Sequence, residues 1–238
     1  MPILLLIRHA TNDFVKTGRL PGRTPNIHLN DEGRKQAEAL GQMLRERPLD
    51  AVYSSPLERA IETAWHVAAP HGLPIHIRSA LADIDNGDFT GKEIKQLSED
   101  EATKEVWQVV IETPSRAKFP NGEAMLDMQR RVVDALEAII AAHGDVDVAD
   151  APATSQTVGD GKPGDRTSEP LKKRPQVVAI VAHADVIKAA LAHYLGMPFD
   201  NFQRLSIAPA SVSTLAVSSD EQTGKRRILV MNVNQTAP

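Results

Sequence analysis

Two continuous apolar runs place the strongest constraint on how this chain folds. Residues 3–7 and 177–182 contain only apolar side chains, and each run ends at a polar residue, Arg8 or His183. Such runs are typical of strands that are buried on both faces, as in parallel sheets with helices on both sides. Residues 50–53 and 75–77 are shorter candidates for neighbouring strands.

Helical patterns lie between these strands. Asn30 can cap a helix whose first turn is acidic, and Ser55-Pro56 is typical of a second helix start. Residues 123–142 and 185–194 show amphipathic spacing. Strands that alternate with helices predict an α/β fold with a mostly parallel central sheet.

The last apolar segments predict a hairpin. Residues 212–217 and 228–233 alternate or run apolar on either side of a turn that contains Gly224. The edge strand of such a hairpin can pair with a second copy of the chain. A homodimer is therefore one expectation, although the sequence leaves the oligomeric state open.

One polar segment interrupts the pattern. Residues 144–175 contain no aromatic residue and no isoleucine, but four prolines and four glycines. A segment of this composition buries too little apolar area to offset its ordering entropy. We therefore expect residues 1–238 to form one domain with a flexible polar insertion at about 144–175.

Composition excludes several functional classes. The chain has 238 residues and a formal net charge of −4, which argues against general nucleic-acid binding. Cysteine is absent, so disulfides and thiolate nucleophiles are excluded. The apolar start is too short to span a membrane and does not resemble a signal peptide. We expect a cytoplasmic protein with no membrane partner.

Reactive side chains follow each predicted strand. In parallel α/β sheets, ligands bind beyond the carboxyl ends of the strands. Two guanidinium groups there can bind a phosphoryl group, a neutral imidazole can act as the nucleophile, and a carboxylic acid can protonate the leaving group. This chemistry requires no metal ion. The residues concerned are Arg8, His9, Ser54, Ser55, Arg59, Asp83, Asp85, Asp88 and His183.

Five sequence blocks, in order, resemble the histidine phosphatase superfamily, in its branch of phosphoglycerate-mutase-like phosphatases. They cover the chain from residue 3 to about residue 195, apart from the polar insertion. The resemblance implies a three-layer α/β/α sandwich, a small phosphorylated substrate and no cofactor. The blocks are Arg-His-Ala at 8–10, Ser-Pro-Leu-Glu-Arg-Ala-Ile-Glu-Thr-Ala at 55–64, Leu-Ala-Asp-Ile-Asp-Asn-Gly-Asp-Phe-Thr-Gly at 81–91, Pro-Asn-Gly-Glu at 120–123 and Val-Ala-His at 181–183.

The resemblance also implies roles for individual residues. His9 would become phosphorylated, and Arg8, Arg59 and His183 would hold the phosphoryl group. Asp83 stands where the family has its glutamate acid. Because aspartate is one methylene shorter, either the loop moves inward or the neighbouring Asp85 takes the role.

Other positions depart from the family pattern or carry open roles. Ala10 replaces the usual glycine. Val15 stands near the place of an asparagine that is frequent in the family, and Asn12 is the candidate to replace it as a phosphate ligand. Asp185 follows the second histidine motif, where it would cap the next helix or orient an imidazole.

Two further side chains complete the candidate site. Arg23 would contact a second anionic group of the substrate, or act as an ordinary solvated arginine. Glu123 would orient Arg59, face the site or cap the long helix. Substrate choice is expected to depend on loops around residues 15–27 and 92–122, and the side chains of these loops show no pattern that predicts a substrate.

Three functions follow. The first is a phosphomonoester hydrolase that acts through a phosphohistidine on a small phosphorylated metabolite. The second uses the same site for phosphoryl transfer of the phosphoglycerate mutase type. The third, of a different class, is a protein that binds a phosphorylated ligand without turning it over. Intact Arg8, His9, Arg59 and His183 favour the first two.

Overall fold

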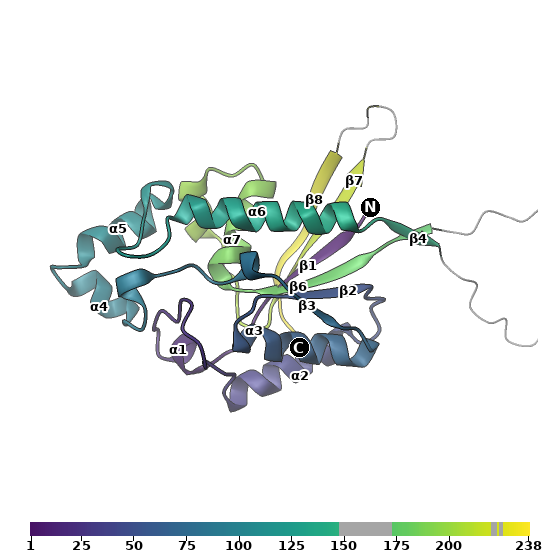
Figure 1. The fold of residues 1–238 in the computed structure, drawn as a ribbon, viewed down its shortest axis with the longest axis horizontal. Helices are drawn as coiled ribbons and strands as arrows, with labels where there is room; N and C mark the ends of the chain where they lie inside the picture. Colours follow the sequence, from purple (N-terminus) through teal and green to yellow (C-terminus); the bar gives the residue numbers. More distant parts are fainter. Residues whose placement is uncertain (148–172, 220–222, 224–225) are drawn as a thin grey trace, which may run out of the picture.

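A six-stranded mixed sheet forms the centre of the fold (Figure 1). The structure is a computed structural model, and it describes residues 1–147, 173–219, 223 and 226–238. The strand order of the sheet is β3-β2-β6-β1-β7-β8. The first four strands are parallel, β7 pairs antiparallel with β1, and β8 pairs antiparallel with β7. The strands are β1 (Ile3–Arg8), β2 (Ala51–Ser54), β3 (Ile75–Ile77), β6 (Val177–Ala182), β7 (Val212–Ser219) and β8 (Arg226–Gln235).

Helices cover both faces of the sheet, as Figure 1 shows. The helices α2 (Asp31–Leu44) and α3 (Glu58–Ala68) lie on one face, and α6 (Met125–Ala142) and α7 (Ala184–Tyr194) lie on the other. The three-layer α/β/α arrangement is therefore confirmed, as is the terminal hairpin of β7 and β8. Shorter elements are α1 (Asp13–Lys16), α4 (Ile94–Glu99), α5 (Lys104–Glu112), η1 (Ala69–His71), η2 (Ser79–Leu81), η3 (Gly87–Phe89), η4 (Pro114–Arg116) and η5 (Phe199–Arg204).

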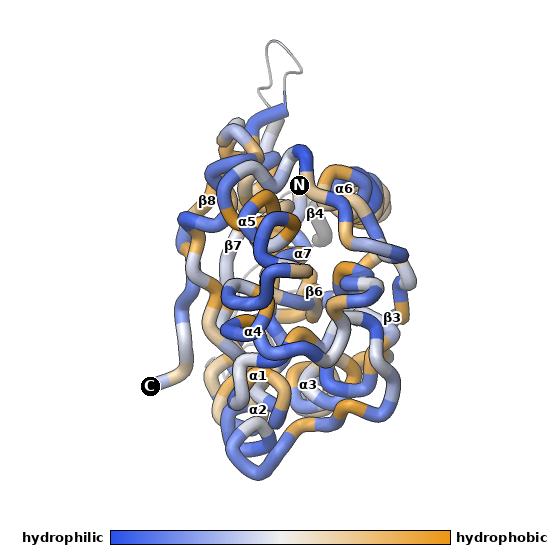
Figure 2. Tube along the Cα trace, turned by 90° about the vertical axis from the view of Figure 1, so that its left-hand side faces the viewer, coloured by the Kyte–Doolittle hydropathy of each residue, from blue (hydrophilic) through white to orange (hydrophobic). Residues whose placement is uncertain are grey.

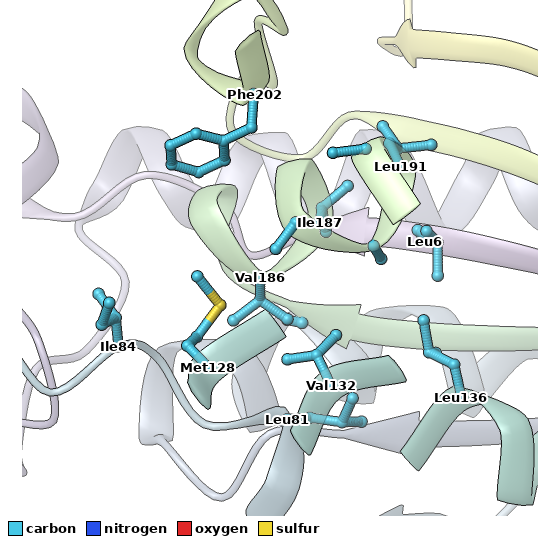
Figure 3. Close-up of a cluster of buried hydrophobic side chains, with 14 of the residues drawn as sticks. Leu6, Leu81, Ile84, Met128, Val132, Leu136, Val186, Ile187, Leu191 and Phe202 are labelled. Atoms are coloured by element: carbon cyan, nitrogen blue, oxygen red, sulfur yellow. The ribbon is translucent and has the colours of Figure 1, made fainter. Parts of the chain in front are cut away.

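The apolar runs form the two central strands. Leu4 and Leu6 of β1 belong to the core beneath α6 and α7, whereas Leu5 and Ile7 pack in the core beneath α2 and α3. Figure 3 shows Leu6 in the first of these cores, close to side chains of both helices. In Figure 2, hydrophobic and hydrophilic residues alternate along the helices that flank the sheet, as expected for helices with one buried side. Each fully buried leucine contributes about 1.5–3 kcal/mol.

The register of β1 and β6 places two histidines side by side. The strands pair in parallel from Ile3 opposite Val177 to Arg8 opposite Ala182. His9 then donates its backbone N–H to the carbonyl of Ala182 at 2.9 Å. The next residue after β6 is His183, so both histidines leave the sheet at its carboxyl edge.

The starts of two helices test the capping predictions. Asn30 accepts a hydrogen bond from the backbone N–H of Gly33 at 2.9 Å, and its role as the cap of α2 is confirmed. The prediction that Ser55 caps the next helix is wrong, since α3 begins at Glu58 with Leu57 as its cap. The Ser55 hydroxyl instead lies 2.8 Å from Nε2 of His183.

The ends of the predicted polar insertion are paired strands. β4 (Asp145–Asp147) and β5 (Lys173–Pro175) form an antiparallel ribbon. Arg174 donates twice to the carboxylate of Asp50, at 2.7 Å each, which anchors the ribbon beside the start of β2. Residues 148–172, which make up most of the predicted insertion, lie outside the described residues.

The region expected as a loop at 92–122 contains helices. α4 and α5 occupy much of it, because apolar residues such as Leu97, Trp107 and Val110 recur on one side and are buried. Among the described helices, none combines the length and the apolar character that a membrane span requires.

Candidate active site

The two histidines at the carboxyl edge form the centre of the site. The ring centroids of His9 and His183 are 5.1 Å apart, and the rings are tilted by 59°. Only 2% of His9 and 1% of His183 is exposed. Both imidazoles are thus held in a largely water-free environment next to one another.

Hydrogen bonding leaves one nitrogen of His9 available. Nδ1 lies 2.7 Å from the carbonyl oxygen of Ala10. Because a carbonyl oxygen only accepts hydrogen bonds, Nδ1 carries the proton and Nε2 keeps its lone pair. Burial lowers the pKa of His9 well below its usual range, and the nearby His183, Arg59 and Arg8 lower it further. The imidazole is therefore neutral and suited to nucleophilic attack through Nε2.

The guanidinium groups of a buried arginine, Arg59, and a half-buried one, Arg8, flank the histidines. Arg59, on the first turn of α3, is fully buried and donates from Nη2 to the carbonyl of Gly22 at 2.8 Å. Arg8 donates from Nη1 to the carbonyl of Ile207 at 2.6 Å. Nε and Nη1 of Arg59 and Nε of Arg8 have no hydrogen-bond partner among the described residues. Buried charged donors without partners are costly, so this arrangement is suited to binding an anion.

Asp83 reaches the centre of the site. Its Oδ2 accepts a hydrogen bond from Nη2 of Arg59 at 3.0 Å and lies 3.5 Å from Nδ1 of His183. Burial raises the pKa of this carboxyl, although the charge of Arg59 opposes the increase. Asp85 turns away, since its Oδ1 accepts the backbone N–H of Gly87. Of the two candidate acids, the geometry therefore favours Asp83.

An arginine from α6 holds the loop that carries Asp83. Arg131 donates from Nη1 to the carbonyls of Ala80 and Ala82 at 2.7 and 2.8 Å. Its Nη2 donates to the carbonyl of Asp83 at 3.0 Å, and its Nε donates to Glu123 at 2.7 Å. These bonds tie the backbone of the loop to α6, with the Asp83 carboxyl beside Arg59 and His183.

Glu123 and Arg23 support the same loop from outside the site. Arg23 donates from Nε to the carbonyl of Asp83 at 3.0 Å and from Nη2 to Glu123 at 2.9 Å. The expectations that Glu123 orients Arg59 or caps the long helix are wrong. Its carboxylate binds Arg23 and Arg131 instead of Arg59, and the cap of α6 is Ala124. Burial tends to raise the pKa of Glu123, but hydrogen bonds and charges from the arginines lower it overall.

The remaining predicted residues lie at the margin of the site. Asn12 is fully buried, and its Oδ1 caps α1 by accepting the backbone N–H of Val15 at 3.0 Å. Its Nδ2 has no hydrogen-bond partner in the described part of the chain. The prediction that Asp185 caps α7 is wrong: His183 occupies that position, and Asp185 pairs with Lys188 at 3.4 Å.

A cavity of about 450 Å³ opens beside the histidines. Arg8, His9 and Asp83 form part of its wall, so a ligand in it can reach the site. Within the described ranges, no group of three or more histidine, aspartate or glutamate side chains is placed to hold a metal ion. The remaining wall includes Val15, Leu20, Ile84, Ile94, Asp185, Lys188, Gln203 and Leu205.

Several residues of the site were not identified from the sequence. Thr63 accepts the backbone N–H of Ala10 at 3.0 Å, and it donates to the carbonyl of Arg59 at 2.7 Å. Like Ser55, it lies inside the block at residues 55–64, which was a usable signal. Arg131 had no such signal, since an arginine on an amphipathic helix normally points to solvent.

A comparison with protein families identifies the chain. The sequence model of the histidine phosphatase superfamily (branch 1) matches residues 4–149 and 167–230. The chain belongs to this superfamily. The five blocks that suggested the resemblance lie within the matched ranges.

Individual members of the superfamily are similar to this chain over most of its length. Phosphoserine phosphatase 1 of Hydrogenobacter thermophilus is 25% identical over 98% of this chain and 92% of its own. The 2,3-bisphosphoglycerate-dependent phosphoglycerate mutase of Thermoplasma acidophilum is 24% identical over 91% of this chain and 88% of its own. The structure of a mycobacterial glucosyl-3-phosphoglycerate phosphatase has the same fold, with a TM-score of 0.76 at 22% identity over 99% of both chains.

Proposed function

We propose that this protein is a phosphomonoesterase that transfers the phosphoryl group of a small phosphorylated metabolite first to His9 and then to water. One observation carries the proposal. His9 is neutral and buried, its Nδ1 is bound to the Ala10 carbonyl, and its ring lies beside His183 and two arginines with unpaired donors. This arrangement matches what phosphoryl transfer to an imidazole needs.

In the first step, Nε2 of His9 attacks phosphorus and the ester bond to the leaving oxygen breaks. Charge that spreads over the phosphoryl oxygens is stabilised by N–H groups of Arg8 and Arg59. The carboxylic acid of Asp83 donates its proton to the departing alkoxide, which leaves as an alcohol. The products of this step are phosphohistidine at His9 and a carboxylate at Asp83.

In the second step, a water molecule attacks the phosphohistidine. The carboxylate of Asp83 takes a proton from the water as the oxygen–phosphorus bond forms. The bond between phosphorus and Nε2 of His9 breaks, and inorganic phosphate leaves. His9 and Asp83 return to their starting protonation states, so the cycle balances.

The charges around the outer cavity favour hydrolysis over mutase-type transfer. A bisphosphorylated intermediate needs cations for its second phosphate. In the cavity wall beyond the histidines, Lys188 is paired with Asp185, and Arg19 is paired with Glu93 at 3.0 Å. These two positive charges are already balanced by carboxylates, so the outer cavity is better suited to a single phosphoester.

The proposal is tested by measuring phosphate release from a panel of small phosphomonoesters. We expect the wild-type chain to release phosphate, and His9→Asn to abolish it. His193→Asn is the matched control, because His193 is an exposed histidine on α7. Brief incubation with phosphorus-labelled substrate should leave acid-labile label on His9.

Three outcomes would change the assignment. Full activity of His9→Asn would contradict a phosphohistidine at that position. Interconversion of 2- and 3-phosphoglycerate that is faster than hydrolysis would favour the mutase. Tight binding of phosphate esters without turnover would instead indicate a ligand-binding protein.

A further inference from the structure

Ser55 lies against the second histidine of the site. Its Oγ is 2.8 Å from Nε2 of His183, with both side chains buried. The backbone N–H of Ser55 donates to the carbonyl of Val181 at 2.9 Å, so the turn after β2 is tied to the strand that ends at His183. The hydroxyl is therefore held in place by the sheet itself.

We propose that Ser55 is a positioning residue that fixes the tautomer of His183, with the proton on Nδ1. The inference rests on the proposed phosphatase function and deepens it. In this tautomer, the Ser55 hydroxyl donates to Nε2, and the Nδ1–H group faces the centre of the site, where Oδ2 of Asp83 lies 3.5 Å away.

The hydrogen-bond requirements of Ser55 support this direction of donation. Its Oγ accepts the backbone N–H of Leu57 at 3.3 Å, which leaves the hydroxyl proton free to bind Nε2 of His183. In the opposite tautomer, Oγ would accept two hydrogen bonds. The hydroxyl proton of Ser55 would then have no acceptor among the described residues that contact this side chain. A buried donor without a partner costs about 1–3 kcal/mol.

The tautomer matters because His183 carries only one ring proton. Burial and the charges of Arg59, Arg8 and Arg131 lower the pKa of His183 well below its usual range, so the ring is neutral. A neutral imidazole has one donor and one acceptor nitrogen, and the bond at one nitrogen determines the role of the other.

The choice of tautomer also decides what Asp83 can do. If Nδ1 of His183 were the acceptor, the protonated carboxyl of Asp83 would donate to this nitrogen. The acidic proton would then be bound to His183 and not available to the leaving oxygen. With the proton on Nδ1, the imidazole donates to a phosphoryl oxygen or to Oδ2 of Asp83. The acidic proton of Asp83 then remains available for the leaving oxygen.

The neighbouring Ser54 provides a matched control. It is also fully buried, but its Oγ donates to the carbonyl of Ser55 at 2.9 Å instead of bonding to the histidine. Ser54→Ala and Ser55→Ala therefore remove the same chemical group from adjacent buried positions. Ser55→Thr keeps a hydroxyl at the position that contacts His183.

The test measures the tautomer directly in the full chain. Nitrogen NMR of histidine-labelled protein distinguishes protonated from unprotonated ring nitrogens, and His183→Gln assigns the signals. We expect wild-type protein, Ser54→Ala and Ser55→Thr to carry the proton on Nδ1 of His183. In Ser55→Ala, we expect a mixture of both tautomers.

Kinetics of phosphate release from an alkyl phosphate give the second readout. We expect Ser55→Ala to lower kcat by about 10–100-fold, with KM little changed. This range is typical of groups that orient a functional imidazole through a hydrogen bond to its other ring nitrogen. Ser55→Thr should restore most of kcat. A proton on Nε2 of His183 in wild-type protein would overturn the proposal, and so would an unchanged tautomer in folded Ser55→Ala. Absence of hydrolysis by wild-type protein would overturn the phosphatase function instead, while the NMR result would still decide the tautomer.

Discussion

Nη2 of Arg59 donates to Oδ2 of Asp83 at 3.0 Å, and both side chains are buried. Two opposing effects therefore act on one carboxyl group: burial raises its pKa, and the guanidinium lowers it. Because the net shift is upward, this carboxyl keeps its proton at a higher pH than an exposed aspartate does, as a general acid must.

The first prediction concerns the leaving group. We expect Asp83→Asn to lower kcat for alkyl phosphates by about 10²–10⁴-fold, because the departing alkoxide loses its proton donor. With p-nitrophenyl phosphate the first step should hardly change, since that leaving group departs without a proton; a burst of nitrophenol checks this. Asp85→Asn should behave like wild type, because the Asp85 side chain accepts the backbone N–H of Gly87 and an asparagine oxygen can do the same. Equal losses in the first step for both substrates would contradict the assignment of Asp83 as the acid.

The second prediction concerns stability at acidic pH. His9 and His183 have lowered pKa values in the folded state, so below about pH 6.5 the unfolded chain binds protons that the folded chain does not. The free energy of unfolding should therefore fall as the pH decreases, by up to about 1.4 kcal/mol per pH unit for each histidine. Urea unfolding of His183→Gln should show a shallower slope, and His193→Gln an unchanged one.

Asp83 acts in the opposite direction on this pH dependence. Its pKa is raised in the folded state, so the folded chain binds its proton at a higher pH than the unfolded chain does. As the pH falls through that window, Asp83 adds stability, and Asp83→Asn should steepen the loss. The same pH slope in His183→Gln and in the wild-type protein between about pH 7 and about pH 5 would contradict a neutral His183 in the folded state.

The third prediction concerns the support of the acid loop. Arg131→Met removes the donors to Ala80, Ala82 and Asp83 and leaves Glu123 partly unpaired. We expect the free energy of unfolding to fall by about 3 kcal/mol and kcat to fall with it.

The adjacent arginine is the matched control for this loop. Arg130→Met removes an exposed charge that pairs with Asp127 on the same helix, so it should change stability by less than about 0.5 kcal/mol. Similar effects of Arg131→Met and Arg130→Met in urea unfolding would show that the loop needs no support from α6.

The fourth prediction concerns the contact between α2 and α3. In a free helix, Gly41→Ala would add about 1 kcal/mol of stability. Here a Cβ at Gly41 would lie 2.4 Å from the backbone carbonyl of His66, so the two helices must move apart. We expect a net loss of about 1–3 kcal/mol in thermal unfolding. Gly144→Ala, where a Cβ meets no atom within 4 Å, should be close to neutral.

The fifth prediction concerns the outer cavity. Lys188 lines it, donates to Gln203 at 3.0 Å and is largely buried. Because Lys188 balances the charge of Asp185 in the cavity wall, Lys188→Met leaves that carboxylate unpaired and should raise KM about 10-fold for phosphoesters whose alcohol part carries a carboxylate, with kcat little changed. Lys95→Met, at an exposed lysine on α4, should leave KM unchanged. An equal KM for esters with and without a carboxylate would show that Lys188 does not face the substrate.

The main features of the fold were predictable because they depend on local patterns. The apolar runs at residues 3–7 and 177–182 are typical of strands buried on both faces, and Asn30 has a side chain that caps helix starts well. The start of α3 was not predictable in the same way. Ser55 has a good capping side chain, but its hydroxyl makes a tertiary contact with His183, and such a contact overrides a local preference.

The residues that react were predictable from their motifs, whereas the residues that hold them in position were not. His9, Arg59 and His183 stand in short blocks at strand ends and helix starts. Arg131 reaches Asp83 from 48 positions further along the chain. No periodicity or spacing marks such a long-range pair, so it became visible only once α6 was packed beside the loop.

The ribbon of β4 and β5 brings residues 147 and 173, which are far apart in the sequence, side by side. Asp145 lies opposite Pro175 and Asp147 opposite Lys173, at the amino end of β6, whereas His183 follows its carboxyl end. Changes in the length of the segment between them therefore need not disturb the phosphoryl chemistry. In evolutionary terms, this is a position where a lineage can gain, lose or exchange sequence, and where an engineer can graft a tag.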